Sequence, residues 1–442
     1  MKKWITGLSL AAAAIWLVSL PEGTLAQCAA NFWMTRKQAT LASGFVAYVL
    51  MVAVMVLALR LSWVEQKLGG LDQAYRWHKW AGIAAAATMF VHWMMEQAPK
   101  WLVHGGLLTP PVRKHAAEKM ASSDWMLLAH TTGEIFGYVM LFLVAVAVLK
   151  KIPYQWFRRS HKLFALVFLA VAFHSVALVP ANLWLTPAGV AMVVVTLIGV
   201  LASVVALFGK IGGARRYRGT ASALQRLPGE LIDVTCTLEK PVSYLPGQFA
   251  FARFEGMKDA HPFSISSANT IGNKVRFCIK ALGDDTRRLV GTLCEGVAVE
   301  IEGPYGRFNF VRGGKTPKEV WVAGGVGVTP FLARLEHLAR TQETLEDKTI
   351  PAVEFYYCSQ QDNALLQRVE RLCRQAGVTL HVFDETRQGS LTLEKILQNT
   401  KTPAHAELWF CGPRGLGDAL QNAWRAMGLP LQQFRREHFE MR

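Results

Sequence analysis

Four histidines lie inside long apolar runs, and their spacing forms two matched pairs. His78 and His92 are fourteen residues apart in one run, and His161 and His174 are thirteen apart in another. Ionisable side chains are costly inside a bilayer and usually serve a function there. At about 1.5 Å per residue, the second histidine of each run lies roughly 20 Å beyond the first. Two neutral imidazoles facing each other are the ligands that a six-coordinate haem iron takes.

Pairing across the two helices predicts two haem sites, His78 with His161 near one face of a membrane and His92 with His174 near the other. The helical phase is uneven, however. Fourteen residues return to within about 40° of the starting direction, whereas thirteen miss it by about 140°. The run that carries His161 and His174 therefore needs a bend, a bulge or a long reach from one histidine.

Single histidines in such a chain more often satisfy a backbone carbonyl or lie at an interface. We assign this ordinary role to three further histidines, His104, His115 and His130. The two matched pairs are harder to explain in that way, because both pairs fall on spans that run in the same direction.

The apolar runs predict an all-α membrane domain of six helices over residues 1–210. Five runs, at about 40–60, 78–96, 125–149, 161–180 and 186–208, have the length that a bilayer core requires. A sixth, at 5–20, follows Lys2 and Lys3 and resembles either a cleaved signal peptide or a first transmembrane helix. We prefer a retained first helix for residues 1–26.

The composition separates this apolar half from a globular half. Hydrophobic residues make up 52% of the chain and charged residues 18%, and the long apolar runs all lie before residue 210. The net charge of +16 would suit nucleic acid, but the basic residues flank apolar runs, which indicates membrane orientation instead. Basic clusters at 2–3, 60–79, 150–162 and 210–218 all fall on one side if the spans alternate. This predicts a multi-pass protein of a bacterial-type inner membrane with a cytoplasmic C-terminal half.

The globular half reads as two domains. Short β-rich stretches separated by turn residues predict an antiparallel β-barrel over residues 218–315. Strands alternating with helical patterns then predict an α/β nucleotide-binding domain over residues 316–442. Six of the seven cysteines lie in this half and none forms a CxxC pair, so we expect reduced thiols.

Several motifs at the edges of these elements could bind nucleotides. Lys280, Gly283 and Thr286 combine a cation and a hydroxyl with a glycine turn, which suits a pyrophosphate. A glycine-rich segment that follows a strand and opens a helix lets backbone N–H groups reach a second pyrophosphate. Alone, each motif could be an ordinary turn. The residues of the second segment are Gly324, Gly325, Gly327, Thr329 and Pro330.

With the histidine pairs on the third and fifth runs, the chain resembles the ferric reductase and NADPH oxidase superfamily, and within it the bacterial NADPH oxidases. The resemblance implies that the four histidines bind two b-type haems and that the barrel binds FAD. The motif of His261, Pro262, Phe263 and Ser264 is similar to the family's flavin-binding motif. Asp285 departs from the family's oxidases, which often carry Trp there.

The resemblance also implies two groups near the reacting rings. Cys411, Gly412 and Pro413 are similar to the family's cysteine motif, in which the thiol lies close to the nicotinamide and the flavin. Phe439 is the candidate for the aromatic residue that covers the flavin face, with three residues beyond it. Cys411 by itself could equally be a buried structural cysteine. Ser359 follows the second strand of the nucleotide domain and, with Arg387, slightly favours NADPH over NADH.

The resulting hypothesis is transmembrane electron transfer from cytosolic NAD(P)H through FAD and two haems to an external acceptor, with O2 giving superoxide preferred. A ferric-chelate or other metal reductase of the same architecture is the second interpretation. A transporter or proton channel with a nucleotide-sensing domain is a third, of another class. The expected partners are the lipid bilayer, NAD(P)H and O2 or a ferric chelate, with no nucleic acid and no obligatory protein partner. Acceptor, oligomeric state and regulation have no marker in the sequence.

Overall fold

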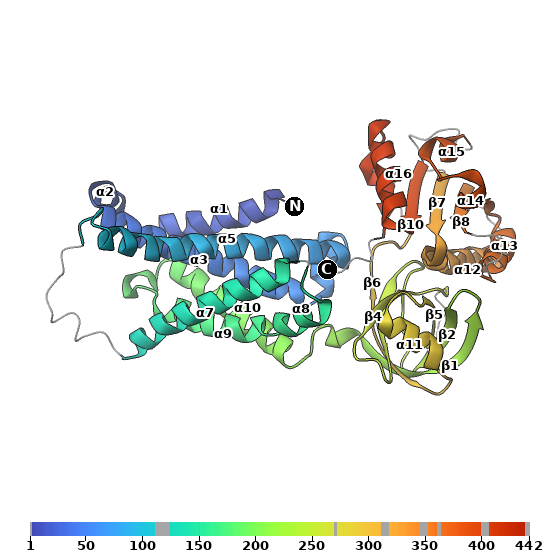
Figure 1. Cartoon of the computed structure of the whole chain (residues 1–442), viewed down its shortest axis with the longest axis horizontal. Helices are drawn as coiled ribbons and strands as arrows, with labels where there is room; N and C mark the ends of the chain where they lie inside the picture. The colour runs from blue at the N-terminus through green and yellow to red at the C-terminus, as the bar shows by residue number, and fades with distance from the viewer. Residues whose placement is uncertain are drawn as a thin grey trace. The chain divides into compact units, whose positions relative to one another are not determined.

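The computed structural model describes residues 2–110, 124–149, 151–268, 272–310, 318–344, 352–359, 364–398 and 406–437. The chain divides into two compact units (Figure 1). The first holds Met1–Gly69 and Gln73–Ile211, and the second holds Gly212–Arg442 with Gly70–Asp72. The boundary agrees with the change of composition near residue 210.

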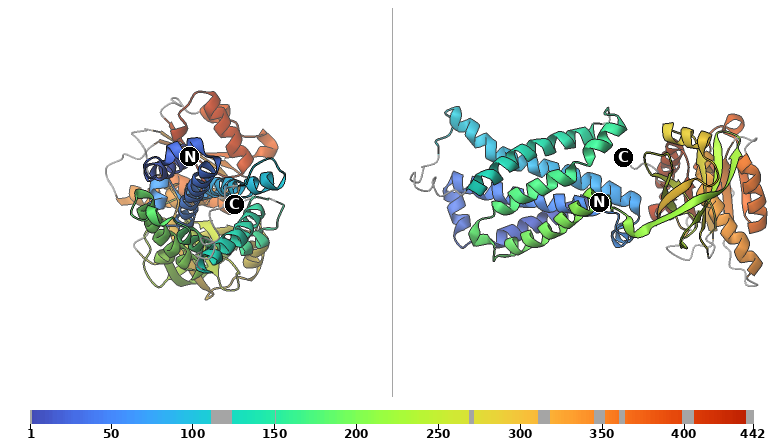
Figure 2. Two further views of the ribbon diagram at one scale, coloured as in Figure 1. Left: turned by 90° about the vertical axis from the view of Figure 1, so that its left-hand side faces the viewer. Right: turned by 90° about the horizontal axis from the view of Figure 1, so that it is seen from below.

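The first unit is helical throughout. Its long helices run alternately up and down one bundle axis (Figure 2). The elements are α1 (Lys2–Val18), α2 (Thr24–Ala30), α3 (Phe32–Ala58), α4 (Ser62–Leu68), α5 (Leu71–His104), α7 (Asp124–Val148), α8 (Tyr154–His161), α9 (Phe164–Ala177), the 3-10 turn η1 (Ala181–Leu183) and α10 (Pro187–Leu207).

Four helices among the described residues are long and apolar enough to cross a membrane. They are Phe32–Ala58, Asp124–Val148, Trp156–Ala177 and Pro187–Leu207. Lys3–Val18 is apolar but shorter, and α5 is long but carries Asp72, Glu96 and several basic residues. The helical, apolar character of the domain is thus confirmed, whereas the count of six spans is not.

The ends of the helices bring the basic clusters together. The start of α1, the end of α3, the start of α5, α8 and the end of α10 all lie at the same end of the bundle (Figures 1 and 2). The predicted basic clusters flank these element ends, apart from Lys150, which lies outside the described residues. The arrangement is the one that the charge pattern predicts, while its assignment to the cytoplasmic face stays a prediction.

Aromatic and small residues build the core of the bundle. The Tyr48 ring of α3 stacks on Phe168 of α9, with ring centroids 5.7 Å apart. Gly199 of α10 lies against the same Phe168 ring, where an added Cβ would come within 2.4 Å of it. Trp16 of α1 packs against Phe45 of α3, at 5.8 Å between ring centroids. The first helix is therefore part of the packed bundle.

The hydroxyl of Ser19, directly after α1, accepts a hydrogen bond from the first turn of α10. The first N–H groups of a helix have no partner within it. Here the backbone N–H of Ala188 donates to Oγ of Ser19 at 2.9 Å, and Ser19 in turn donates to the carbonyl of Ile15 at 2.7 Å. Both residues are buried, so this bond joins the two ends of the domain's sequence inside the bundle.

The second unit begins with the predicted β-barrel. Its six strands are β1 (Arg216–Leu227), β2 (Leu231–Leu238), β3 (Phe249–Phe254), β4 (His261–Ser264), β5 (Lys274–Lys280) and β6 (Ala298–Tyr305). They pair antiparallel in the order β4-β3-β6-β1-β2-β5. A bridge between Ile265 and Phe277 nearly closes the sheet on itself. The helix α11 (Asp284–Thr292) connects β5 to β6.

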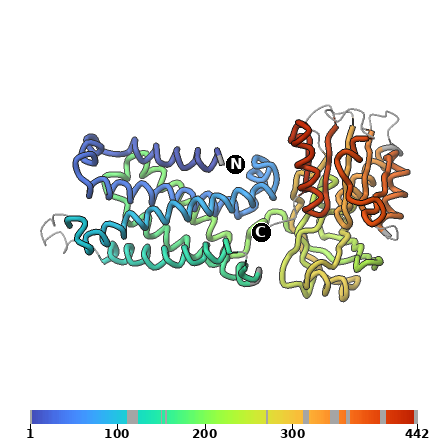
Figure 3. Tube along the Cα trace, turned by 45° about the horizontal axis from the view of Figure 1, so that its top comes forward, coloured from blue at the N-terminus to red at the C-terminus, as the bar shows by residue number. Residues whose placement is uncertain are grey.

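The remaining strands form a five-stranded parallel sheet in the order β11-β10-β7-β8-β9. Figure 3 shows it in orange and red beside the yellow-green barrel. Trp321, Phe355 and Trp409 pack on one face of the sheet, and Val322 and Phe410 pack on the other. This two-sided burial is typical of parallel sheets covered by helices.

The elements of this domain are β7 (Lys318–Gly324), the turn η3 (Gly325–Val328), α12 (Thr329–Thr344), β8 (Ala352–Cys358), α13 (Ala364–Ala376), β9 (Thr379–Phe383), α14 (Glu385–Gln388), α15 (Leu393–Leu397), β10 (Ala406–Cys411), α16 (Arg414–Ala426) and β11 (Phe434–Arg436). The barrel followed by an α/β domain is as predicted, with β1 starting two residues earlier than expected.

The bond between Ser19 and Ala188 can be tested by Ser19→Ala in the full chain. Removing a capping hydroxyl costs about 1 kcal/mol, so we expect the helical unit to unfold at a temperature lower by roughly 2–4 °C. Tryptophan fluorescence during heating in detergent measures this. Ser9→Ala, which changes the same residue type earlier in α1, should leave the transition in place. Equal transitions in both variants would contradict the capping role.

Candidate functional site

The predicted inner histidine pair comes together in the structure. The rings of His78 in α5 and His161 at the end of α8 have centroids 5.9 Å apart, with an angle of 64° between their planes. A metal–imidazole bond is about 2 Å long, so two imidazoles on opposite sides of one metal have centroids roughly 6 Å apart. The observed separation therefore suits a metal shared between these rings.

Backbone carbonyls orient three of the four rings. Nδ1 of His78 lies 3.0 Å from the carbonyl oxygen of Val54, and Nδ1 of His92 lies 2.8 Å from that of Thr40. Nδ1 of His174 lies 2.9 Å from the carbonyl oxygen of Ala129. A carbonyl only accepts, so each Nδ1 must carry the proton. The unprotonated Nε2 is then free to bind a metal.

The outer pair makes no ring contact of the kind that His78 and His161 make, among the residues that the structure describes. Nδ1 of His174 bonds to the carbonyl of Ala129, the residue before His130. His130, which we left outside the ligand set, lies next to Ala129 in α7 and is exposed. Its position beside the outer pair is a feature that sequence reasoning missed.

The hydrogen-bonding pattern of the helix changes between the two histidines. The helix α8 ends at His161 and α9 begins at Phe164, and Lys162 and Leu163 between them keep near-helical backbone angles. The N–H of Leu163 donates to the carbonyl of Ser160 at 3.0 Å, a tighter turn than an α-helix makes. This irregular turn lies directly after the first histidine, within the segment where the thirteen-residue spacing requires a change of phase. Nδ1 of His161 is buried and, within the described part of the chain, makes no hydrogen bond.

Two glycines make room for the outer pair. A Cβ on Gly133 of α7 would lie 2.0 Å from Nδ1 of His174. A Cβ on Gly44 of α3 would lie 3.0 Å from Nδ1 of His92. Neither residue was predicted as part of a site. The only sequence signal is a glycine within an apolar span, which is too common to be specific.

The packing of α5 also suits an inserted cofactor. The helices α3, α9 and α10 pack closely together, as do α7 and α9, whereas α5 has no comparable backbone partner among the described helices. Directly packed helices lie about 8–10 Å apart. Side chains instead connect α5 to α3, including Arg36, which donates to the carbonyl of Met95 at 2.9 Å. The histidine donors, the glycine positions and this wider spacing together fit two haems.

The flavin motif forms a short edge strand of the barrel. His261 and Phe263 of β4 pair with Ala252 and Ala250 of β3. Oγ of Ser264 is buried and has no hydrogen-bond partner in the described residues. A buried hydroxyl without a partner is costly, so a ligand that bonds to it is expected. This is the hydroxyl that the resemblance assigns to the flavin.

The turn before α11 uses its predicted hydroxyl for its own geometry. Oγ1 of Thr286 accepts from the N–H groups of Leu282 and Gly283, each at 3.0 Å. It therefore caps α11, and its contact to a pyrophosphate stays a prediction. Asp285, the departure from the family pattern, lies 3.2 Å from Nε2 of His261. Lys280 is exposed and is the last residue of β5, six residues before Thr286.

The glycine-rich loop and the cysteine motif meet at the carboxyl ends of β7 and β10. A Cβ on Gly327 would lie 2.4 Å from the carbonyl oxygen of Cys411, and one on Gly324 would lie 2.5 Å from Cδ of Pro413. Only glycine allows these backbones to pack so closely. Gly325, with φ of 55°, faces open space. Ligands of open α/β sheets bind at such a point, where the strand order reverses.

The thiol of Cys411 and the carboxyl of Glu437 lie together at this point. Cys411 is fully buried, and burial raises its pKa well above the usual range. The backbone N–H of Glu437 donates to the carbonyl of Phe410 at 3.2 Å. Burial also raises the pKa of Glu437, whose Oε2 has no hydrogen-bond partner among the described residues. Burial therefore disfavours the charged form of both groups. Sequence reasoning missed Glu437; Phe439, two residues later, lies outside the described residues.

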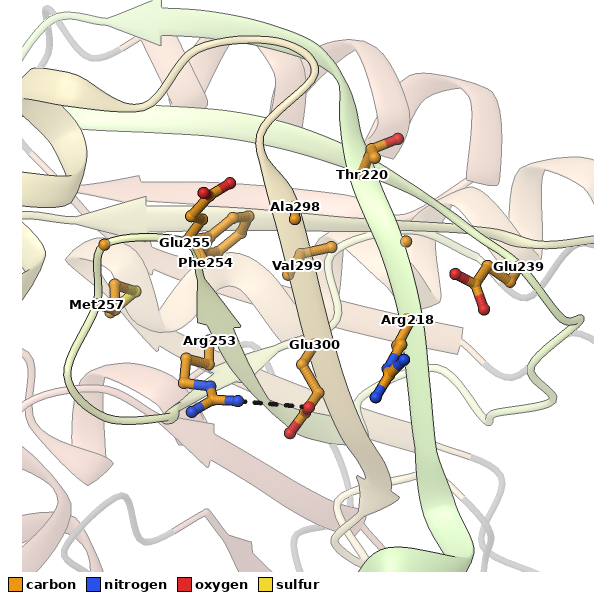
Figure 4. A pocket seen from close by; sticks show the side chains of 12 residues that line it. Arg218, Thr220, Glu239, Arg253, Phe254, Glu255, Met257, Ala298, Val299 and Glu300 are labelled. Atoms are coloured by element: carbon orange, nitrogen blue, oxygen red, sulfur yellow. Dashed lines mark hydrogen bonds and ion pairs between the residues drawn. The ribbon is translucent and has the colours of Figure 1, made fainter.

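A surface hollow of about 500 Å³ lies elsewhere on the barrel. It covers β1, β3 and β6, and both acidic and basic side chains line it (Figure 4). Arg253 and Glu300 form an ion pair across it at 3.4 Å. No residue of the predicted flavin motif lines this hollow, so it is not the flavin site.

Two known families match consecutive parts of the chain. The family described as "Ferric reductase like transmembrane component" matches residues 43–172, and an FAD-binding domain family matches residues 216–309. The first match contains His78, His92 and His161 and ends two residues before His174. The second contains the flavin motif. Together they give the architecture of the ferric reductase and NADPH oxidase superfamily.

Curated relatives are reductases. The reductase component of propane 2-monooxygenase from Rhodococcus jostii is 25% identical over 236 residues, covering 49% of this chain and 61% of that protein. The electron transfer component of 2-halobenzoate 1,2-dioxygenase from Burkholderia cepacia is 26% identical over 222 residues, covering 47% and 60%. The chain thus spans about three fifths of these relatives. The family matches and these relatives support an NAD(P)H-dependent oxidoreductase.

Solved structures with a similar trace include the FAD/NAD-binding domain of a nitric oxide dioxygenase from Vibrio cholerae. It is 20% identical, with a TM-score of 0.42, and covers 50% of this chain and 97% of its own. A flavohemoglobin from Malassezia yamatoensis is 14% identical, with a TM-score of 0.47, covering 92% and 98%.

The glycine beside His174 gives a direct test of the outer site. In Gly133→Ala the added methyl group overlaps the ring of His174, so we expect loss of about one haem per chain from the purified protein. Gly137→Ala, one turn later in α7, adds its methyl group to open space and should keep both haems. Pyridine haemochrome content measures this. Full haem content in Gly133→Ala would contradict the assignment.

Proposed function

We propose that this chain carries electrons from cytosolic NADPH through FAD and two b-type haems to an acceptor outside a bacterial inner membrane, and that this acceptor is O2, giving superoxide. The observation that carries the proposal is the pair of facing rings of His78 and His161 in a chain that also has a reductase domain. The second pair consists of His92, further along α5, and His174 of α9.

The residues of the chain would bind and orient the cofactors. When bound, a flavin accepts a hydride from nicotinamide and releases its electrons singly, and a haem iron accepts one electron at a time. The hydroxyl of Ser264 would bond to the flavin ring, and Phe263 would pack on it. The backbone of Gly324, Gly325 and Gly327 would approach the nucleotide pyrophosphate without side-chain obstruction.

Cys411 and Glu437 would lie near the reacting end of the nicotinamide. Burial raises the pKa of the Cys411 thiol and of the Glu437 carboxyl, because it disfavours the charged form of each group. A site closed to water would favour transfer of a hydride over competing reactions with solvent. We propose that Phe439 covers the flavin face until the nicotinamide arrives.

O2 is the preferred acceptor in this proposal. Two histidines on each haem would leave an external acceptor no open position on the metal, so it would take its electron without binding there. O2 needs no binding groups for such a transfer. A ferric chelate is the second candidate, since the matched membrane family is described as ferric-reductase-like.

Acceptor and layout can be tested together on purified full-length protein. We expect NADPH to reduce both the flavin and the haem Soret band without oxygen, and reduction of cytochrome c in air to be inhibited by superoxide dismutase. Faster reduction of a ferric chelate that dismutase does not affect would favour the metal reductase. A purified protein without a Soret band would exclude the haem proposal and favour the transporter interpretation.

His92→Leu tests the order of the cofactors. It should remove the outer-haem signal. The rate of electron flow to O2 should fall on the order of tenfold or more, because a required metal ligand is absent. Flavin reduction by NADPH should survive. His104→Leu, at the end of the same helix, should retain both haems. Loss of flavin reduction in His92→Leu would contradict the proposed layout.

We also propose that NADPH is preferred over NADH. Ser359 directly follows β8, and its backbone N–H donates to the carbonyl of Phe383 at 3.1 Å. Arg387 follows in α14, exposed and 3.7 Å from Asp384. Both groups therefore lie at the carboxyl ends of neighbouring strands.

Arg387→Ala should raise the KM for NADPH about tenfold, as expected from one lost charge-assisted hydrogen bond. The KM for NADH should hardly change, because NADH lacks the 2′-phosphate. Arg374→Ala, an exposed arginine in α13, is the matched control and should affect neither coenzyme. Equal changes for both coenzymes would exclude Arg387 as the phosphate ligand.

A further inference from the structure

A group of four partly buried charges joins the barrel to the nucleotide domain. Asp233 of β2 and Arg276 of β5 belong to the barrel, and Glu336 of α12 and Arg368 of α13 belong to the nucleotide domain. Their side chains are between 13% and 25% exposed. Two cations and two anions balance, which is how charges are tolerated away from water.

Glu336 is the centre of this group. Its Oε1 accepts from the guanidinium of Arg368 at 2.9 Å and from that of Arg276. Its Oε2 accepts from the backbone N–H of Ala268 at 3.1 Å. One carboxylate therefore receives three donors, from α13, from β5 and from the segment that follows the flavin motif. Arg368 also donates to Asp233 at 2.7 Å.

The same group holds the segment that continues the flavin strand. The backbone carbonyl of Arg276 accepts from the backbone N–H of Ser266 at 2.8 Å. The backbone N–H of Arg276 donates to Oγ of Ser267 at 3.2 Å. Its guanidinium donates to the carbonyl of Ser266 at 3.3 Å. These residues lie two and three positions after Ser264. A shift of Arg276 would therefore be passed directly to the hydroxyl that faces the flavin.

On its other side, Glu336 belongs to the helix that starts at the glycine-rich loop. It lies two turns into α12, which begins at Thr329 directly after the turn Gly325–Val328. Phe331, Leu332 and Leu335 of this helix are completely buried. The helix is thus rigidly packed, and its position determines that of the loop that would bind the nicotinamide dinucleotide.

The charge of Glu336 is secured by its partners. Burial alone would raise its pKa, but the guanidinium groups of Arg276 and Arg368 and the Ala268 N–H outweigh burial, so its pKa is lowered. The carboxylate is ionised at neutral pH. Removing one member of a buried charge group leaves its partners uncompensated, so this group opposes small displacements between the two domains.

We infer that Glu336 is a positioning residue for hydride transfer, which fixes the nucleotide loop at reacting distance from the flavin strand. The inference rests on the proposed NADPH-to-flavin step and on no property of the haems or of the external acceptor. Glu336 does not touch either ring; it acts through Ala268, Arg276 and α12.

The test is Glu336→Gln in the full-length protein, which keeps the size of the side chain and removes its charge. A misplacement of about 1 Å can slow a reaction on the order of 100-fold, so we expect flavin reduction by NADPH in stopped flow to slow at least tenfold. Flavin content should stay near wild type. The long-wavelength absorbance of the nicotinamide–flavin complex should weaken, which a purely stabilising role would not cause.

Glu354→Gln is the matched control. Glu354 is also a partly buried carboxylate of this domain, paired with Lys318 at 3.3 Å and His381 at 2.7 Å, but it joins strands within one sheet. We expect its rate of flavin reduction to equal that of wild type. If Glu336→Gln loses its flavin, Glu336→Asp, which keeps the charge and withdraws it by one methylene group, is measured in its place.

A wild-type rate in Glu336→Gln, or in Glu336→Asp where the first variant lacks flavin, would overturn the positioning role. So would an equal slowing in Glu354→Gln. Wild-type protein whose flavin neither NADPH nor NADH reduces would instead contradict the proposed function, so the two failures are distinguishable.

Discussion

An imidazole inside an apolar bundle must satisfy its own N–H before its second nitrogen can serve a metal. In this chain, carbonyls of other helices meet that need for His78, His92 and His174. A helical carbonyl has a second lone pair beyond its own helical bond, so it can accept without breaking the helix. Since each bond crosses between helices, the packing of the bundle sets the direction of each ring. The glycines beside the outer rings then follow as a steric requirement, because the rings must approach the backbone.

Much of this arrangement could be predicted because helical rise is constant. The pairing of His78 with His161 needs only the spacing and direction of two spans. The position of the irregular turn could not be predicted, since it depends on how α8 and α9 pack separately. The same limit applies to Gly133 and Gly137: both are span glycines, and only the packed structure shows that one contacts a histidine. The count of six spans rested on the length of the apolar runs. The helix α1 is shorter than the four spans, and α5 is long but carries charged residues.

In the reductase unit, motifs that lie on a strand end and its following turn could be predicted because their context is local. Gly324, Gly327 and Cys411 are of this kind, and Ser264 is as well. Glu437 and Glu336 could not be predicted, because the groups that each contacts come from residues far away in the sequence. Their partners come from strands and helices that only the fold brings together. Two kinds of interaction thus stabilise the nucleotide domain. The backbone packs closely at the glycine-rich loop, and the charge group around Glu336 joins the domain to the barrel.

The irregular turn at Lys162 and Leu163 has a consequence for how such sites vary between chains. In one continuous helix, inserting or deleting a residue between two ligands would rotate one of them by about 100° relative to the other. Here the two ligands belong to separate helical segments, so the joint between them can absorb such a change. The number of residues between the two histidines is therefore not a fixed signature of a two-site bundle. A sequence search that demands one spacing would miss chains in which a different link between the helices brings the same ligands together.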